Sequence, residues 1–538
     1  MSDLQRKPST PSDDEKVHAV HVEDTAATLN RTTSHHKAHV HYGLNNNVLE
    51  EAIAATNIPR WSAEARRLYL SLFVSLCCSY ANGFDGSVMS SLIVMDFFQD
   101  RFHMGFTGGK VSAVFGSYVA ANFISTPIAA IVMDKYGRRP SMIAGSIMVI
   151  IGAVIATTAK TLAQLVVARF VLGFGISWSL AAGAYCMEIS LPHWRGRCTG
   201  LFNGGYWVGS IFAAAASFGC NYIQSHLSWQ IPLILQCFCA LLVVIICPFC
   251  PESPRFLMRA GREDEALNFL AKYHGGGDPN APLVKLEFSE MKASIAADDH
   301  SAWWDYSILW KTKARRWRTI QVMMIGCFSQ YCGIGLAYFT TVMFKNAGVN
   351  TVVEQLGYGL LFSGLCAVGS TIGAGVSDHL RRRTALTIGS ICMAVQLACF
   401  AAANAIIVRD ENRGLGLNAS AGKAAIAFWM IYGFTFGFVY TPLQFVVAGE
   451  AATTDMRAKA FAVFNGLMTG MGMINTFAGP IALGTIGAWK YAIVFVVLDL
   501  VQAGCWHFFG VEAQGRTIEE LDWIYDQPNP VKASKKRD

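Results

Sequence analysis

Charged residues are scarce in this sequence. They make up 15% of its 538 residues, whereas 53% are hydrophobic and the mean hydropathy is +0.35. Soluble globular domains carry about 25% charged residues, so this composition predicts a membrane protein. The apolar stretches also lack any alternation with a period of two, which argues against an outer-membrane β-barrel.

Motifs for catalysis, metal binding and nucleotide binding are missing as well. The sequence has no Walker phosphate loop, no HExxH motif and no array of CxxC motifs. Its fifteen cysteines lie almost wholly in apolar stretches, as small apolar side chains do, rather than in a disulfide framework. Gly173 and Gly175 lie inside an apolar stretch, where they predict close helix packing rather than a nucleotide loop. The sequence therefore predicts no enzyme, no cofactor and no metal site.

Twelve apolar runs of about 20 residues are present, each long enough to cross a hydrocarbon core. They lie near 69–96, 111–133, 141–159, 163–190, 198–219, 229–250, 319–343, 357–377, 384–407, 424–449, 459–481 and 489–510. They predict an all-α membrane protein with two pseudo-symmetric six-helix bundles, 67–250 and 319–510. Between the bundles lies a polar stretch, 251–318, which we expect to be a cytoplasmic loop with short helices.

The two ends of the chain are polar. Residues 1–66 are rich in Ser, Thr and His, which predicts a disordered tail rather than a signal peptide. The histidines of this tail could bind metal, but no regular ligand spacing supports a site, and a solvated tail is favoured. Basic residues concentrate in the loops 134–140 and 378–383, in 251–318 and in the tail 511–538. The positive-inside rule then places both termini in the cytoplasm, and the net charge of +6 needs no nucleic acid partner.

One polar segment occurs twice, about half the chain apart, and each copy joins two apolar runs. A Glu is followed by an Arg seven residues later and by an Asn eight residues after that. The first copy has Glu188, Arg195 and Asn203, and the second has Glu450, Arg457 and Asn465. Such a repeat is typical of a transporter built from two related halves with a substrate path between them.

Five motifs in order resemble those of the sugar porter family of the major facilitator superfamily, and most closely its fungal lactose-permease-type branch. They are GFDGS at 83–87, DKYGRR at 134–139, RFVLG at 169–173, PESPRFL at 251–257 and EAQGRTIEE at 512–520. The resemblance covers about 66–525. It implies a secondary active transporter that takes up a sugar, such as a disaccharide, a hexose or a related solute, by alternating access. It also implies a plasma-membrane location, and we expect a functional monomer in the lipid bilayer.

Two charges lie deep in the first six runs. Asp85 is midway along the first run and Arg169 is in the fourth. A carboxylate in hydrocarbon must face a cavity or a partner, or take up a proton. Protonation of Asp85 would release Arg169, so the pair predicts proton coupling, and the resemblance implies the same. The alternative is a fixed structural ion pair.

Charges at the loops predict a gate on the cytoplasmic side. In the first half, Asp134, Arg138 and Arg139 are expected to bond to Glu188 and Arg195. In the second half, Asp378, Arg382 and Arg383 are expected to bond to Glu450 and Arg457. The alternative is that these charges serve only as topology determinants. The second loop has Arg381 where the family has Gly, which puts its tight turn in question.

Sugar recognition needs amides for hydroxyls and aromatic faces for the C–H surface. The candidates are Asn203, Trp207, Gln330, Tyr331, Phe445 and Asn465. Asn203 and Gln330 stand at amide positions of the family. The absence of amides at Gly335 and Met468 reduces hydroxyl binding in the second half, and would suit a larger, less polar or acidic substrate. For each aromatic residue the alternative is bundle packing.

Two further residues and two other functions stay open. Asp499, in the twelfth run, is either a second proton site or a structural hydrogen-bonding group, and the latter is favoured. Asn418 begins a glycosylation sequon. The alternative functions are a facilitator or exporter of another metabolite, or a transporter-like nutrient sensor, against which the short tail 511–538 argues.

Overall fold

The computed structural model describes residues 46–56, 61–179, 181–297, 305–376, 379–416, 418–453, 456–514, 516 and 518–535. Two units make up the chain, 1–50 and 51–538, and every helix after α2 (Asn46–Ala55) belongs to the second. Helix α2 occupies residues where the composition predicts disorder. Residues 1–45 and 57–60, also part of the predicted tail, lie outside the described residues.

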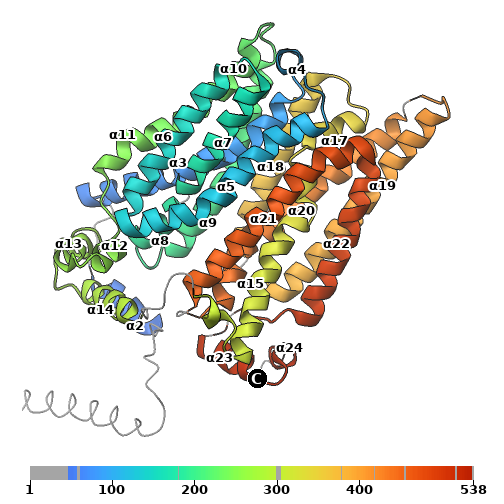
Figure 1. Cartoon of the computed structure of the whole chain (residues 1–538). Helices are drawn as coiled ribbons and strands as arrows, with labels where there is room; N and C mark the ends of the chain where they lie inside the picture. The colour runs from blue at the N-terminus through green and yellow to red at the C-terminus, as the bar shows by residue number, and fades with distance from the viewer. Residues whose placement is uncertain are drawn as a thin grey trace, which may run out of the picture. The chain divides into compact units, whose positions relative to one another are not determined.

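Helices form the first half and the central stretch. The first half consists of α3 (Ala63–Leu92), α4 (Asp96–Phe102), α5 (Gly109–Tyr136), α6 (Arg138–Thr157), α7 (Leu162–Ser179), α8 (Ala181–Ile189), α9 (Arg195–Cys220), α10 (Leu227–Leu235), α11 (Cys237–Ile246) and the 3-10 turn η1 (Cys247–Phe249). The central stretch holds α12 (Pro254–Arg259), α13 (Glu263–Tyr273), α14 (Pro282–Ala297) and η2 (Ser307–Leu309). In Figure 1 the first half runs from blue to green.

The second half runs from yellow to red in Figure 1. It consists of α15 (Lys313–Tyr331), α16 (Ile334–Ala337), α17 (Thr340–Asn346), α18 (Val352–Val376), α19 (Arg382–Asn412), α20 (Ala419–Ala451), α21 (Arg457–Thr485), α22 (Ala488–Phe509), α23 (Ile518–Asp526) and α24 (Pro530–Ala533). Helix α15 begins at Lys313 rather than near 319, because the Thr312 side chain accepts a hydrogen bond from the Arg315 N–H and caps the helix.

Nine helical stretches among the described residues are long and apolar enough to cross a membrane. They comprise α5, α6, α7 with α8, α10 with α11, α15 with α16, α18, α19, α20 and α22. Three more helices, α3, α9 and α21, have 26 to 30 residues and are also long enough to cross a membrane. Together they account for the twelve predicted spans. Exposed apolar side chains such as Phe212, Phe238 and Val497 cover their outer faces, as expected of a surface that contacts lipid.

Small residues let neighbouring helices approach closely. A Cβ at Gly173 of α7 would lie 2.0 Å from the carbonyl oxygen of Tyr118 on α5, and one at Gly175 would lie 2.7 Å from the carbonyl of Gly145 on α6. Any side chain at these positions would push the helices apart. The prediction of close helix packing at Gly173 and Gly175 is therefore confirmed.

The two halves meet along α5 with α21 and α9 with α18. The Ser112 hydroxyl of α5 donates to the carbonyl of Phe477 on α21, 2.8 Å away. The Thr341 hydroxyl of α17 donates to the carbonyl of Ser90 on α3, 2.5 Å away. These bonds lie at the end of the bundle opposite the central stretch, so the halves are in contact at that end.

Candidate functional site

Asp85 and Arg169 are brought together at the centre of the first half, but not as a carboxylate–guanidinium pair. Asp85 on α3 is 0% exposed and Arg169 on α7 is 2% exposed. The Arg169 Nη1 and Nη2 atoms donate to the main-chain carbonyl of Asp85, at 3.3 and 3.4 Å. Neither carboxyl oxygen of Asp85 has a hydrogen-bond partner among the described residues. The expected direct hydrogen bond between the side chains is therefore absent from this conformation.

The ring of Tyr118, rather than the carboxylate of Asp85, contacts the guanidinium of Arg169. The Arg169 guanidinium lies over the Tyr118 ring, 4.4 Å from its centroid, in a cation–π arrangement. Tyr118, on α5, was not a candidate from the sequence, because a tyrosine within an apolar run has no local feature that separates a functional role from packing. With Arg169 held by the ring and the carbonyl, a neutral, protonated Asp85 is the form that best suits its surroundings.

Trp207 on α9 connects the two halves. Its indole N–H donates to the hydroxyl of Thr441 on α20, 3.3 Å away, and its ring meets Phe436 edge-on with 6.3 Å between centroids. Trp207 is 7% exposed, and Asn203, one turn earlier on the same face of α9, is half-buried. The two candidates in the first half therefore face the second half, as a substrate path between the halves requires.

Gln330 and Tyr331 form the end of α15, at a break in the seventh span. Gly333 follows with a left-handed φ of +88°, which favours glycine, and α16 begins at Ile334. The Gln330 side chain is half-buried, and its Oε1 atom has no hydrogen-bond partner among the described residues. An unsatisfied buried amide oxygen is able to accept a bond from a ligand hydroxyl.

Asn475 on α21 supports this break and was not a candidate from the sequence. Its Nδ2 atom donates to the carbonyl of Gln330, 2.7 Å away, and the residue is 3% exposed. It lies ten residues beyond Asn465, outside the repeated segment. The repeated segment therefore gave no indication that Asn475 supports the break.

Phe445 and Asn465 lie in a different environment. Phe445 on α20 packs edge-on against Phe464 on α21, with 5.3 Å between ring centroids. The Asn465 side chain is half-buried, and its main-chain carbonyl accepts a bond from the Thr469 hydroxyl. The contact of Phe445 corresponds to the packing alternative for this residue.

A cluster of charges in the first half joins the ends of three helices. The Arg138 Nε atom lies 2.9 Å from Glu188 Oε2, and its Nη1 atom lies 3.8 Å from Asp134 Oδ1. The Ser253 hydroxyl also donates to Glu188, at 2.5 Å. Arg138 is 7% exposed, so this pair is shielded from solvent and more strongly coupled than a surface ion pair.

The second half repeats this pair. Arg382 Nη2 lies 3.0 Å from Glu450 Oε1. Arg383 turns away from the pair and donates to the carbonyls of Trp506 and His507 at the end of α22. Asp378, the third predicted member of this cluster, lies outside the described residues.

Two glutamates that the repeat did not reveal cap these loops in the same way. Glu252 accepts bonds from the main-chain N–H groups of Arg138 and Arg139, at 3.2 and 3.3 Å. Glu512 accepts from the N–H groups of Arg382 and Arg383, at 2.7 and 3.3 Å. Each carboxylate thus caps the start of α6 or α19, where N–H groups lack intrahelical partners. The Arg139 side chain donates to the carbonyl of Pro248 instead of joining the Glu188 cluster.

Burial and hydrogen bonding oppose each other at Glu252. Burial raises the pKa of its carboxyl above the ordinary value, while the N–H donors and Arg139 lower it, and burial has the larger effect. An ionised Glu252 is therefore held by its donors at a net electrostatic cost.

Two predicted gate residues make their main contacts with the central stretch. Arg195 lies 3.4 Å from Glu287 of α14 and also interacts electrostatically with Glu188, so it binds the central stretch beside the first loop cluster. Arg457 lies near Arg255 of α12. Both contacts have one physical cause: the central helices approach the starts of α9 and α21, and this contact between distant segments has no local pattern in the sequence.

Arg381 does not disturb the second loop. Gly137 begins α6 with a φ of 104°, which favours glycine, whereas Arg381 caps α19 with a φ of −62°. The two loops thus enter their helices through different backbone conformations, and Arg381 needs no strained turn.

Asn418 and Asp499 complete the candidates. Asn418 caps α20 by accepting a bond from the Ala421 N–H, and its Nδ2 atom donates to Asp410, 3.0 Å away. Glycosylation at this nitrogen would have to displace that bond.

Asp499 on α22 is 0% exposed, and neither carboxyl oxygen has a hydrogen-bond partner among the described residues. The structural hydrogen bond that was favoured for Asp499 is therefore wrong for this conformation.

Known proteins resemble the chain over most of its length. The high-affinity glucose transporter of Kluyveromyces lactis is 28% identical over 483 residues, which cover 86% of each chain. The MFS-type transporter criB of Aspergillus cristatus is 25% identical and covers 84% of this chain and 92% of its own. The solved structure of the proton:xylose symporter XylE bound to 6-bromo-6-deoxy-D-glucose superposes with a TM-score of 0.70 at 17% identity, over 86% of this chain and all of that one. Residues 70–525 match the sugar (and other) transporter family, so the chain belongs to this family and has the fold of the major facilitator superfamily.

Proposed function

We propose that this protein takes up a sugar, such as a disaccharide, a hexose or a related solute, by alternating access driven by protons. It works as a monomer in the plasma membrane, with both termini in the cytoplasm. The observation that carries proton coupling is the carboxyl of Asp85, which is fully buried and lacks a hydrogen-bond partner among the described residues, beside an arginine that binds its carbonyl instead. The sugar itself is supported by the family and by the glucose transporter relative.

The coupling cycle uses Asp85 and Arg169 as a switch. With Asp85 protonated, Arg169 stays on the Tyr118 ring and the Asp85 carbonyl, as it does here. Loss of the proton creates a carboxylate that attracts the Arg169 guanidinium. Arg169 then exchanges its contacts with the Tyr118 ring and the Asp85 carbonyl for a contact with the Asp85 carboxylate. One charge crossing 100 mV is worth about 2.3 kcal/mol, or about 50-fold accumulation. The energy released by one proton is therefore enough to drive sugar uptake against a concentration gradient.

Substrate binding is assigned to Asn203, Trp207, Gln330 and Tyr331, with a lesser role for Phe445 and Asn465. The support for the first two is their position on the face of α9 turned towards the second half. The support for Gln330 is its unsatisfied amide oxygen at the break of the seventh span.

Gating is assigned to the two loop clusters centred on Arg138–Glu188 and Arg382–Glu450. Each pair lies within one half, so a gate built on them acts by fixing the helix ends that close towards the other half. Asp134, Arg139, Asp378, Arg383, Arg195 and Arg457 are retained in this proposal as residues that surround the pairs. Glycosylation at Asn418 and the resemblance to the fungal lactose-permease-type branch stay predictions.

The test is an uptake screen in a host that lacks sugar transporters, with labelled mono- and disaccharides and sugar acids at two external pH values. Coupled uptake predicts accumulation of at least one sugar, with more at the lower pH. The Asp85→Asn variant should lose accumulation while it keeps exchange. Accumulation by Asp85→Asn equal to that of the parent would overturn the role of Asp85.

A second candidate is the facilitated movement or export of another metabolite. Gly335, Phe445 and Met468 offer no side-chain hydrogen bond at positions that the resemblance to the family implicates in substrate binding. The relative criB is named only as an MFS-type transporter. The same screen separates this candidate, because it predicts no pH-dependent accumulation of any sugar. A nutrient sensor would show no flux at all.

A further inference from the structure

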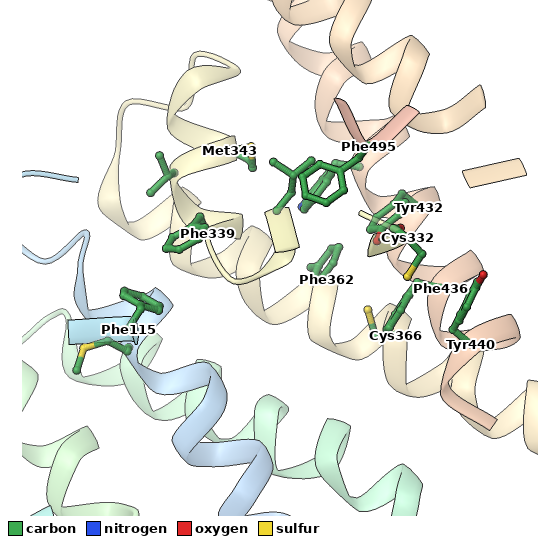
Figure 2. Packing of buried hydrophobic residues seen from close by; sticks show 14 of the residues in the cluster. Phe115, Cys332, Phe339, Met343, Phe362, Cys366, Tyr432, Phe436, Tyr440 and Phe495 are labelled. Carbon is green, nitrogen blue, oxygen red and sulfur yellow. Dashed lines mark hydrogen bonds between the residues drawn. The ribbon is translucent and has the colours of Figure 1, made fainter. Parts of the chain in front are cut away.

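Side chains of α20 and α21 donate hydrogen bonds to the main chain at the break in the seventh span. The carbonyl groups at the end of a helix lack intrahelical partners, and inside a membrane they need other donors. The Tyr432 hydroxyl of α20 donates to the carbonyl of Cys332, 2.9 Å away, and Asn475 donates to the carbonyl of Gln330, 2.7 Å away. Figure 2 shows Tyr432 beside Cys332. The break is thus a specific, side-chain-supported hinge.

A carboxyl group lies next to this hinge. Asp499 on α22 is 0% exposed and interacts electrostatically with Cys332 at the end of α15 and with Tyr432 and Tyr440 of α20. Helix α19 also packs against α22, and the hydroxyl of its Ser390 bonds to the Tyr440 hydroxyl, 3.1 Å away.

The surroundings of Asp499 suit its neutral form. Among the described residues its two oxygens have no hydrogen-bond partner and form no ion pair. The hydroxyls of two tyrosines that interact electrostatically with Asp499 are already used. Tyr432 donates to the carbonyl of Cys332, and Tyr440 donates to Gln502 Oε1, 2.9 Å away. An ionised carboxylate without donors in hydrocarbon is strongly disfavoured.

We propose that Asp499 is a second proton-binding site, and that its protonation is coupled to the hinge of the seventh span. While the hinge is closed, as here, Asp499 carries a proton. When the Tyr432–Cys332 bond opens, the O–H bond of the Asp499 carboxyl breaks and the proton passes to water. The Tyr432 hydroxyl then donates to the new carboxylate instead of to the Cys332 carbonyl. The site belongs to the second half of the molecule, and it depends on neither Asp85 nor the identity of the substrate.

The first measurement detects the proton itself. Infrared difference spectra of the purified full-length protein in lipid nanodiscs would be recorded over a pH titration, and they need no substrate. The parent should show a protonated-carboxyl C=O band at neutral pH that Asp499→Asn lacks and that the matched variant Asp85→Asn retains. Spectra of the parent and Asp499→Asn that superpose at every pH would overturn the proposal, and would leave the proposed role of Asp85 untouched.

The second measurement tests the coupling to the hinge. Hydrogen exchange of the segment 326–346, corrected for intrinsic rates, should rise in the parent over the pH range in which the Asp499 band disappears. It should stay low at every pH in Asp499→Asn and follow the parent in Asp85→Asn. Equal pH dependence in the parent and Asp499→Asn would overturn the coupling.

A third variant keeps the proposal testable if Asp499→Asn does not fold. Tyr432→Phe retains the ring but removes the hydroxyl that closes the hinge and that would stabilise the carboxylate. Exchange of 326–346 should then be raised at every pH, and the Asp499 band should persist to higher pH than in the parent. An unchanged band position in Tyr432→Phe would contradict the hydroxyl switch.

Discussion

The imidazole Nδ1 of His274 and the Oε2 atom of Glu287 lie 2.5 Å apart, with 0% and 4% of their side chains exposed. The pair joins α13 to α14. The His274 Nε2 atom lies 3.2 Å from the carbonyl of Ile189 at the end of α8, and Glu287 also binds Arg195 at the start of α9. Through these contacts the pair attaches the central helices to the first half.

Removing one member of this buried pair should loosen the central stretch. His274→Ala leaves the Glu287 carboxylate buried with only a long contact to Arg195, and the loss of one partner of a buried pair costs about 3–5 kcal/mol. Thermal unfolding in detergent should show a clear drop in Tm, and limited proteolysis should cut within 273–297. The control is Arg262→Ala, which breaks the exposed pair with Glu265 and should change stability by less than about 1 kcal/mol. Similar effects of the two variants would contradict this role of His274.

Loss of Arg138 should weaken the loop cluster and shift the conformational balance. Arg138→Ala leaves Glu188 with the Ser253 hydroxyl but without its cation, so the ends of α6 and α8 are no longer held together. Transport should fall, and hydrogen exchange of 134–140 and 186–195 should rise. Arg382→Ala should have the matching effect on 381–386 and 448–453.

The control for the loop cluster is Arg259→Ala. Arg259 is 52% exposed and lies 3.8 Å from Asp134, so its loss should leave transport near the parental level. Unchanged exchange and transport in Arg138→Ala would count against the proposed gate.

Two amides should dominate substrate affinity. Loss of one partner of a buried hydrogen bond costs about 1–3 kcal/mol, which corresponds to about 5- to 150-fold in affinity. Asn203→Ala and Gln330→Ala should therefore raise the apparent KM strongly while surface expression stays normal. Asn412→Ala, an exposed amide at the end of α19, serves as the matched control. Near-parental affinity in both variants would place the substrate elsewhere.

The stability of the first loop should depend on pH through Glu252. Burial raises the pKa of this carboxyl above its ordinary value of 4.5, so the folded protein binds the proton more tightly than the unfolded chain does. Relative to Glu252→Gln, the parent should gain stability as pH falls through the raised pKa towards 4.5, and should lose that gain as pH rises. If the Tm of the parent and the Tm of Glu252→Gln change in parallel between pH 4.5 and the raised pKa, the pKa of Glu252 is not raised.

The sequence by itself determined the membrane class, the helical spans and the division into two related halves. These properties follow from composition, from the length of apolar runs and from a repeat. All three are visible in the sequence without knowing which segments meet in space. The charges of the two basic loops also predicted that Arg138 and Glu188, and likewise Arg382 and Glu450, come together, and the structure forms both pairs. Their role as a gate stays a prediction.

Only the tertiary structure decided which groups meet across helices. The contact of Arg169 with Tyr118 and a main-chain carbonyl, the capping by Glu252 and Glu512, and the pairing of Arg195 with Glu287 each join segments far apart in the chain. Hydropathy indicates that a helix spans the membrane, but not how the helix is rotated about its axis or which neighbour it faces. That rotation comes from close packing at small residues such as Gly173, and it places Asp85 beside the carbonyl-bound arginine and Asp499 beside the hinge.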